Sequence, residues 1–310
     1  MAFTDMGISL LVRLFSERTP FAGGSPYSAM SHHVRQLQAQ VGSGSRVLQF
    51  EPYLAARGVG EIRMDPALPC DGCVEPIGRS YEEGFRLVLK RASAPTRMRF
   101  TIAHEICHTF FYEVVPELKF APHETDSLEE RLCNVGAAEL LIPADDLHAQ
   151  ASRLAPSLLA LEELARDYAV SMEAMALRLR VLRLWESEIS FWHRKTGGSF
   201  VLDRIYGSRA DWTWVDQTPL QKAWQAGRSE VVQGRTFVDC EDGQHRYWAK
   251  RVNFQAKRHG DGIVVLWSGG PFVSAKKDLP LFRRRRRSVQ QPTPGHMQRK
   301  TVCAKSRGAS

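Results

Sequence analysis

Apolar positions recur with a helical period through the middle of the chain, and shorter strand-like runs flank this helical stretch. From about Thr96 to Trp185 the helical spacing continues almost without a break. Ahead of it, the pattern predicts a helix that stops near Gly58 and short strands at 61–64, 72–78 and 85–91. This part of the chain is therefore expected to form a small sheet covered by a mainly helical body.

Two changes in composition divide the chain further. Residues 1–45 end in VGSGS, a flexible-linker composition, so we expect a loosely attached N-terminal extension of one or two helices. All seven tryptophans lie between residues 185 and 267, where strand-like runs alternate around a helix candidate, TPLQKAWQAG. That alternation predicts a separate α+β domain after the helical body. The fold class expected for the chain is α+β.

Positive charge is concentrated at the C-terminal end. The net charge is +8, but the residues from 276 onward hold eleven Lys or Arg and one Asp, a charge of +10 that leaves −2 for the rest. This tail is poor in apolar residues and contains Pro292, Pro294 and Gly295, which is typical of a disordered segment. The tail could contact nucleic acid or acidic partners, but its charge gives no information about the charge on the surface of the folded part.

The cysteines and the N-terminus indicate a cytoplasmic protein. The six cysteines are scattered without framework spacing, which favours reduced thiols. Cys70 and Cys73 form a CxxC, but no second CxxC completes a four-thiolate zinc site, so a turn is the better interpretation. The first forty residues lack a long apolar run, so we expect neither a signal peptide nor a membrane span.

The stretch RFTIAHEICHTFFYE, residues 99–113, carries the strongest chemical signal. His104 and His108 lie four apart, so on a helix their Cβ atoms share one face about 5–6 Å apart and can ligate one zinc ion. Glu105 projects beside that face, where it can act as the general base toward water. The alternative is a half-buried helix whose histidines form ordinary hydrogen bonds. The surrounding apolar residues imply burial, and a metal would satisfy all three buried polar groups.

A catalytic zinc needs a third protein ligand, which a second helix predicted at 127–143 can supply. Glu139 lies nine positions after Glu130, about 180° around the helix, so only one of them can face the metal. We choose Glu130, because Asn134 on its face could accept the Nδ1–H of a ligand histidine and orient the ring. Glu129 and Glu139 are expected to be solvent-exposed or in surface ion pairs.

Together, RMRFTIAHEICHTFFYE and the following EERLCNVGAAELLIPADDL resemble the ImmA/IrrE family of metallo-endopeptidases. The resemblance covers roughly residues 47–185 and includes an RxxFTxAHExxH helix and an ExxxN helix. It implies a zincin-like peptidase domain with one Zn²⁺ per chain. By this resemblance, His104, His108 and Glu130 would hold the zinc, and Glu105 would act as the general base.

Some positions depart from the family pattern or remain open. Cys133 and Gly136 stand where alanine and phenylalanine are commoner in the family, which bears on packing more than on chemistry. A tetrahedral oxyanion would need a further donor. Tyr112 and His123 are near in sequence, but neither has a spacing that selects it, and packing or surface roles are the alternatives.

Residues 157–185 form two amphipathic helices broken at 169–171 and resemble a helix-turn-helix, with Ser171 as an N-cap. Arg178, Arg180 and Arg183 would then lie on or near a recognition helix that touches DNA. A helical hairpin that closes the peptidase domain has the same apolar pattern. The arginine run 283–287 is more typical of a solvated or localising tail than of a specific reader.

The sequence therefore predicts a zinc endopeptidase. By resemblance, its substrate would be a helix-turn-helix transcriptional repressor, cut to release a stress-response, mobile-element or toxin–antitoxin operon. The alternative is a DNA-binding transcriptional regulator with a vestigial metal site. The tryptophan-rich part faintly resembles a GAF-type sensor domain, and a structural or dimerisation domain is equally compatible. The expected segments are an N-terminal extension at 1–45, a zinc peptidase domain at 46–150, a helix-turn-helix-like segment at 151–185, a tryptophan-rich α+β domain at 186–275 and a basic disordered tail at 276–310.

Overall fold

A computed structural model shows a mixed α+β protein with two sheets and two compact units. The first unit comprises residues up to Leu147 together with Arg166–Ser171, and the second comprises His148–Ala165 and the described residues from Met172 onward. His123 and the basic tail lie outside the residues that the structure describes. The described residues are 10–20, 23–42, 45–78, 83–91, 94–115, 127–207, 212–241, 247–269 and 272–273.

The first unit contains a three-stranded sheet in the order β1-β3-β2. β1 (Val59–Met64) runs parallel to β3 (Phe85–Leu89), and β2 (Gly72–Pro76) pairs antiparallel with the other side of β3. The central strand is the most apolar, and its residues 87–89 are almost completely buried. The three strands lie where the sequence pattern predicted them, and β2 leaves one edge free beside the helices.

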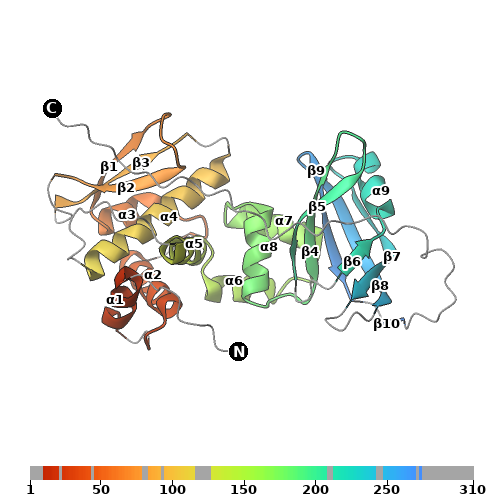
Figure 1. Ribbon diagram of the computed structural model, residues 1–310, viewed down its shortest axis with the longest axis horizontal. Helices are drawn as coiled ribbons and strands as arrows, with labels where there is room; N and C mark the ends of the chain where they lie inside the picture. Colours follow the sequence, from red (N-terminus) through yellow and green to blue (C-terminus); the bar gives the residue numbers. More distant parts are fainter. Residues whose placement is uncertain are drawn as a thin grey trace. The chain divides into compact units, whose positions relative to one another are not determined.

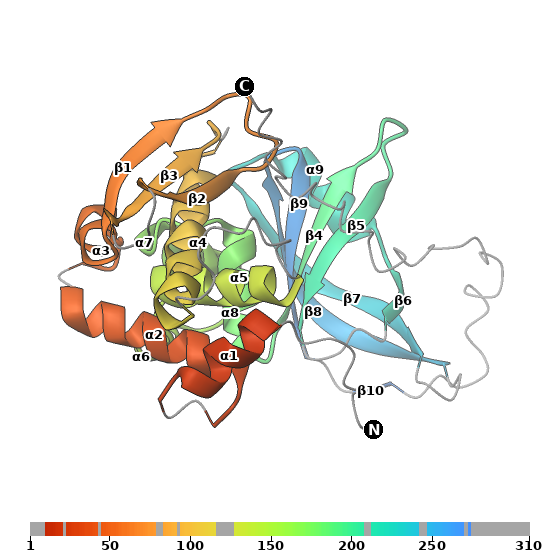
Figure 2. The same cartoon turned by 60° about the vertical axis from the view of Figure 1, so that its left-hand side comes forward.

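Helices form two further layers beneath this sheet. α4 (Pro95–Val114) contacts β2 and β3, and α5 (Ser127–Leu141) packs along α4, as Figure 1 shows. α2 (Pro26–Val41) lies on the side of α5 away from the sheet (Figure 2). At the meeting point of the three helices, a β-carbon on Gly136 would lie 2.6 Å from Cys107 Sγ and 2.8 Å from Met30 Sδ. Glycine is therefore required here for the close approach of α5.

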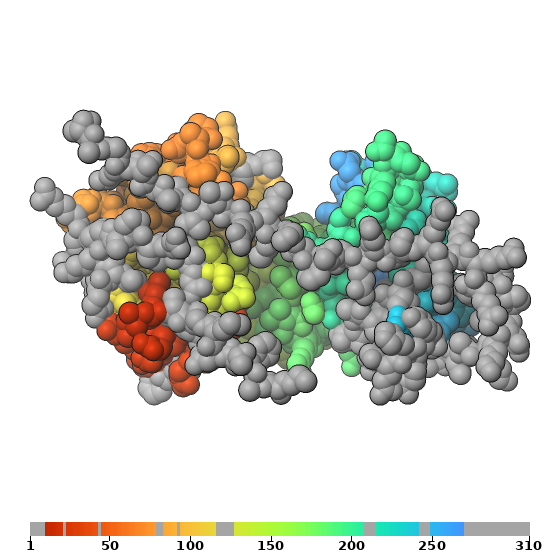
Figure 3. Space-filling model, in the orientation of Figure 1, coloured from red at the N-terminus to blue at the C-terminus, as the bar shows by residue number. Residues whose placement is uncertain are grey.

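The expectation that the N-terminal segment is loosely attached was wrong. In α1 (Leu10–Arg18) Val12 and Phe15 are fully buried, and the Phe15 and Phe111 rings lie 4.3 Å apart. α2 buries Met30 and Val34 completely. The outer side of α1 forms the red patch of the surface in Figure 3. These helices belong to the core of the first unit because their apolar faces cover the outer side of α4 and α5, while α3 (Phe50–Ala56) leads into β1.

The second unit is built on an antiparallel sheet in the order β5-β4-β9-β8-β7-β6, with β10 paired to β8. α9 (Thr218–Ala226) covers one face of the sheet, and the core between them contains Leu220, Ala223, Val252 and Trp267. This is the tryptophan-rich α+β region that the sequence predicted. The other helices and strands are α6 (Ala144–Ala151), α7 (Leu158–Asp167), α8 (Met172–Val181), β4 (Glu188–Arg194), β5 (Phe200–Tyr206), β6 (Trp212–Val215), β7 (Val231–Glu241), β8 (Tyr247–His259), β9 (Gly262–Ser268) and β10 (Phe272–Val273).

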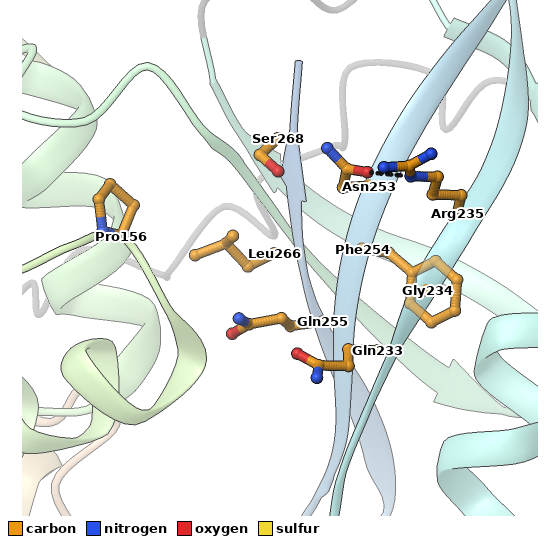
Figure 4. A pocket seen from close by; sticks show the side chains of 9 residues that line it. All are labelled: Pro156, Gln233, Gly234, Arg235, Asn253, Phe254, Gln255, Leu266 and Ser268. Atoms are coloured by element: carbon orange, nitrogen blue, oxygen red, sulfur yellow. Dashed lines mark hydrogen bonds between the residues drawn. The ribbon is translucent and has the colours of Figure 1, made fainter. Parts of the chain in front are cut away.

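An open cavity of about 360 Å³ lies on the sheet of the second unit (Figure 4). Gln233, Gln255 and Leu266 are cross-strand neighbours in one row, and Arg235 Nε donates to Asn253 Oδ1 at 3.2 Å in the next row. These side chains are largely polar and include no residue of the histidine motif. A second cavity, of about 480 Å³, is also in this unit. Neither cavity bears on the chemistry that the sequence singled out.

The helix-turn-helix-like pattern corresponds to α7 and α8. Ala169, between them, adopts a left-handed conformation with φ 52°. On α8, Arg178 is buried and Arg180 is exposed to solvent, and Arg183, just after the helix, is also exposed. Glu173 accepts a hydrogen bond from Tyr206 of β5, so α8 is tied to the sheet of its own unit. Within the described part of the chain, no helix is both long enough and apolar enough to cross a membrane.

Candidate metal centre

α4 positions both histidines and Glu105. The helix begins at Pro95 after an extended Ala94, a favourable start because proline at the first helical position leaves no N–H without a partner. No glycine or proline interrupts it afterwards, and most of its surface is buried. His104 and His108, one turn apart, therefore face α5, and Glu105 turns toward the sheet. The sequence predicted both the helix and its burial.

Two histidine nitrogens and a carboxylate converge between α4 and α5. His104 Nε2 and His108 Nε2 lie 3.1 Å apart. The Glu130 oxygens lie 3.3 Å from the first of these nitrogens and 3.6 Å from the second. Nitrogen and oxygen ligand atoms of a tetrahedral zinc ion are separated by about 3.3–3.6 Å, given bonds of about 2.0–2.2 Å. The three side chains thus have the donor types and the spacing of a zinc-binding group.

The opposite ring nitrogens are each held by an acceptor. His104 Nδ1 donates to Asn134 Oδ1 at 3.1 Å, the contact that the sequence suggested for Asn134. His108 Nδ1 donates to Glu129 Oε1 at 2.9 Å. Because both Nδ1 atoms are donors, both Nε2 atoms of the neutral rings carry lone pairs that point at the same region. Without a cation, the two lone pairs face each other and repel. A cation between the rings would instead form one bond to each nitrogen.

Two carboxylates expected at the surface are buried instead. Glu129 is only 2% exposed and accepts the hydrogen bond from His108, while Glu139 is 6% exposed and accepts from the backbone N–H of Ala144 at the start of α6. The prediction of solvent exposure was therefore wrong for both. The sequence offered no signal for Glu129, because a residue next to Glu130 points about 100° away from it on a helix.

The charges in this cluster shift two pKa values in opposite directions. Burial alone would lower the pKa of His108, but contacts with Cys133, Glu129 and Glu130 raise it well above its ordinary value. Burial alone would raise the pKa of Glu130, but hydrogen bonds from His104 and His108 lower it below its usual range. Both shifts have the direction expected where positive charge between the rings and the carboxylate is stabilised, and a metal ion can supply that charge in place of a proton.

Glu105 is 5% exposed and approaches strand β2. A β-carbon on Gly72 would lie 2.9 Å from Glu105 Oε1 and 2.7 Å from Thr101 Cγ2. Only glycine lets the strand pass this close to the carboxyl group. At the start of β2, Arg97 Nε of α4 donates to Asp71 at 3.0 Å, which fastens the strand to the helix. Glu105 therefore lies between the histidine pair and the free edge of the sheet.

Cys133 is a further potential ligand. From the sequence it was interpreted only as a departure from the family pattern that affects packing. Its Sγ and the ring nitrogens of His104 and His108 lie within 4.8 Å of one another. The thiol is fully buried, hydrogen-bonds to His108, and has a pKa raised by burial to about 12. Its spacing of three residues from Glu130 puts both on one helix face, and this spacing was visible in the sequence.

Of the two suggested oxyanion donors, Tyr112 and His123, the structure describes only Tyr112. Tyr112 lies one turn after His108, and its ring is 5.6 Å from that of Phe85. Burial raises the pKa of Tyr112; the charge of His108 opposes the rise, and Glu129 adds to it. Tyr112 is therefore near the centre and protonated at neutral pH. His123 lies outside the described residues.

Comparison with known proteins points to one family. Residues 77–180 match a peptidase family model described as the IrrE N-terminal-like domain. The radiation response metalloprotease IrrE of Deinococcus deserti is 33% identical over 152 residues, which cover 46% of this chain and 51% of that protein. The protein of the same name from Deinococcus radiodurans is 36% identical over 91 residues, 27% of each chain. The matches thus span about half or less of the curated relatives.

A solved structure, a Mycobacterium tuberculosis transcriptional regulator, superposes with a TM-score of 0.46 and 15% identity. The superposition covers 84% of this chain and 80% of that one.

Proposed function

We propose that the chain is a cytoplasmic zinc endopeptidase that cuts a specific protein, because residues 77–180 match the IrrE N-terminal-like peptidase family model and the relatives it resembles are metalloproteases. The observation that carries this proposal is the convergence of the His104 and His108 Nε2 atoms with the Glu130 carboxylate. The donor set is the two-histidine, one-carboxylate set of a zinc site with an open fourth position.

Each residue of the centre has a proposed role in peptide hydrolysis. His104, His108 and Glu130 would hold the zinc, which would supply Lewis-acid chemistry and lower the pKa of water to about 7. Glu105 takes the proton of the attacking water and delivers it to the leaving amine. Asn134 and Glu129 fix the two rings, as their hydrogen bonds to Nδ1 support. Tyr112 is the proposed donor to the oxyanion.

The proposed substrate is a helix-turn-helix transcriptional repressor, cleaved in a stress response or in the control of a mobile-element or toxin–antitoxin operon. The resemblance to the ImmA/IrrE family supports the repressor, and the two relatives, both radiation response metalloproteases, support the stress response. We also propose that the second unit is a sensor-like domain. Its support is the open polar cavity on the sheet, which could admit a small polar ligand.

Metal analysis of the purified chain tests the zinc site directly. We expect about one zinc per chain in the wild type, loss of most of it in His104→Ala and a lower zinc affinity in Glu130→Ala, because each substitution removes one proposed ligand. Glu139→Gln is the matched control, since this carboxylate is on the same helix but caps α6. A wild-type protein that takes up no divalent metal under any loading condition would overturn the peptidase assignment.

Gly72→Ala tests whether the close passage of β2 positions Glu105. We expect zinc content to stay unchanged while cleavage falls, because the new β-carbon must displace the carboxyl group or the strand. The strain should also lower stability by about 1–3 kcal/mol, measured by denaturant unfolding. Gly60→Ala on β1 is the control, since its β-carbon would meet only the end of the Ile77 side chain at 3.3 Å. Equal cleavage by the two variants would contradict this role.

The alternative function is a DNA-binding regulator that uses residues 157–185 or the basic tail. The burial of Arg178 argues against α8 as a recognition helix, although Arg180 and Arg183 are exposed. Binding of the purified protein to duplex DNA, measured at several salt concentrations, distinguishes the two. Salt-dependent binding that survives loss of the metal, together with absence of cleavage, would favour the regulator.

A further inference from the structure

A fourth metal-binding atom faces the candidate centre from its inner side. Cys133 lies on α5 three residues after Glu130, so both side chains leave the same face of the helix toward α4. The Cys133 side chain is 0% exposed, whereas the Glu130 side chain is 48% exposed. The thiol therefore belongs to the protein interior beside the histidine pair, whereas the carboxylate is partly open to solvent.

The distances place the Cys133 thiol beside the histidine pair that Glu130 also approaches. The Cys133 Sγ and the two histidine nitrogens lie within 4.8 Å of one another. The sulfur–nitrogen separation in a tetrahedral zinc site is about 3.6 Å, given Zn–S of about 2.3 Å and Zn–N of about 2.0–2.1 Å. Thiolate and imidazole are both preferred zinc ligands, so the chemistry of the set fits as well as its spacing.

We propose, on the basis of the zinc peptidase function above, that Cys133 is a fourth protein ligand of the same ion. The ion then has two ligand sets that share His104 and His108. In the open set Glu130 completes three protein ligands and one position remains for water. In the closed set the Cys133 thiolate occupies that position. The thiol S–H bond breaks, a sulfur–metal bond forms, and the proton leaves to solvent.

The closed set holds the peptidase inactive with its metal in place. A catalytic zinc differs from a structural one by its open position, and four protein ligands remove that position. The interior location of Cys133 fits this role, because the thiolate is shielded from competing ligands in solution. Release of the sulfur is then a local step that exposes the ion to water without loss of metal.

Cobalt substitution tests the proposal without any substrate. Co²⁺ bound by a thiolate shows a near-ultraviolet sulfur-to-metal charge-transfer band that nitrogen and oxygen ligands do not produce. We expect wild-type protein reconstituted with Co²⁺ to show this band and Cys133→Ala to lose it while still binding cobalt. Cys107→Ala, a buried neighbour, and the double variant Cys70→Ser/Cys73→Ser, which removes the half-buried CxxC, should keep it.

X-ray absorption at the zinc edge of the wild-type protein also tests whether Cys133 is a ligand. It requires no variant, which could misfold. One sulfur scatterer at about 2.3 Å is expected, beside the nitrogen and oxygen shell. Cobalt bound without the charge-transfer band, or a zinc shell without sulfur, would overturn the ligand role of Cys133 and leave the three-ligand peptidase site intact. Failure to bind either metal would instead overturn the peptidase function and this inference with it.

Discussion

Replacement of Glu105 by glutamine is expected to abolish cleavage while the metal stays bound. The substitution keeps the size of the side chain and removes only its ability to accept a proton. General-base assistance contributes about 10²–10⁴-fold to rate, so cleavage should fall by at least that range. The metal should remain, because Glu105 faces strand β2 at Gly72 and is outside the group formed by His104, His108 and Glu130.

This result separates a catalytic carboxylate from a structural one. Glu105 is 5% exposed, and a buried carboxylate can also serve only to stabilise its helix. In that case Glu105→Gln would lower the midpoint of unfolding and leave cleavage by the folded fraction unchanged. For a general base, the unfolding curve should change little and the rate should collapse. Thermal unfolding and metal content of the same preparations are therefore measured beside the rate.

Because the substrate is a proposal, the cleavage readout should not assume one. Wild-type and Glu105→Gln proteins are each incubated with a lysate of the source cells, and new protein N-termini are compared by mass spectrometry. We expect a small set of termini that appear only with the wild type, with a transcriptional repressor among the parent proteins. Identical sets from the two proteins would show that Glu105 does not support peptide hydrolysis.

The sequence predicted the parts of this centre that follow from helix geometry. The spacing of four residues between His104 and His108 dictates a shared face, and the same rule pairs Glu130 with Asn134. The structure indeed places these four side chains together. The short strands and the helical body were also predicted, because their apolar periods are strong and their ends carry Pro or Gly.

The remaining features depend on packing between segments, which a single sequence does not specify. Adjacent residues on a helix point about 100° apart, so Glu129 could face solvent or α4 depending on how α5 is rotated. The packing of Gly136 against Cys107 and Met30 sets that rotation. The N-terminal helices look like an attachment because of the linker composition that follows them, yet Phe15 is buried against Phe111. In each case the burial of the side chain was determined by contacts between distant segments and not by the local sequence pattern.

Loss of Glu129 is expected to weaken metal binding although this residue is not a proposed ligand. Its Oε1 accepts the Nδ1–H of His108 at 2.9 Å, and the side chain is 2% exposed. In Glu129→Ala the buried Nδ1–H loses this acceptor, at a cost of about 1–3 kcal/mol, and the ring can turn its Nε2 away from the centre. Removal of such a contact typically reduces metal affinity by about 10–100-fold.

Glu129→Gln and Glu139→Ala make this test specific. Glutamine retains an oxygen that can accept the hydrogen bond but lacks the charge, so zinc affinity, measured by competition with a chelator, should fall less than in Glu129→Ala. Glu139→Ala removes a similarly buried carboxylate of the same helix and should cost stability without a matching loss of affinity, because one of its oxygens accepts from the Ala144 N–H at the start of α6. If both alanine variants lose the same affinity, the effect belongs to the packing of α5. A loss confined to Glu129 instead means that a carboxylate outside the ligand set fixes the direction of His108 and hence the geometry of the zinc site.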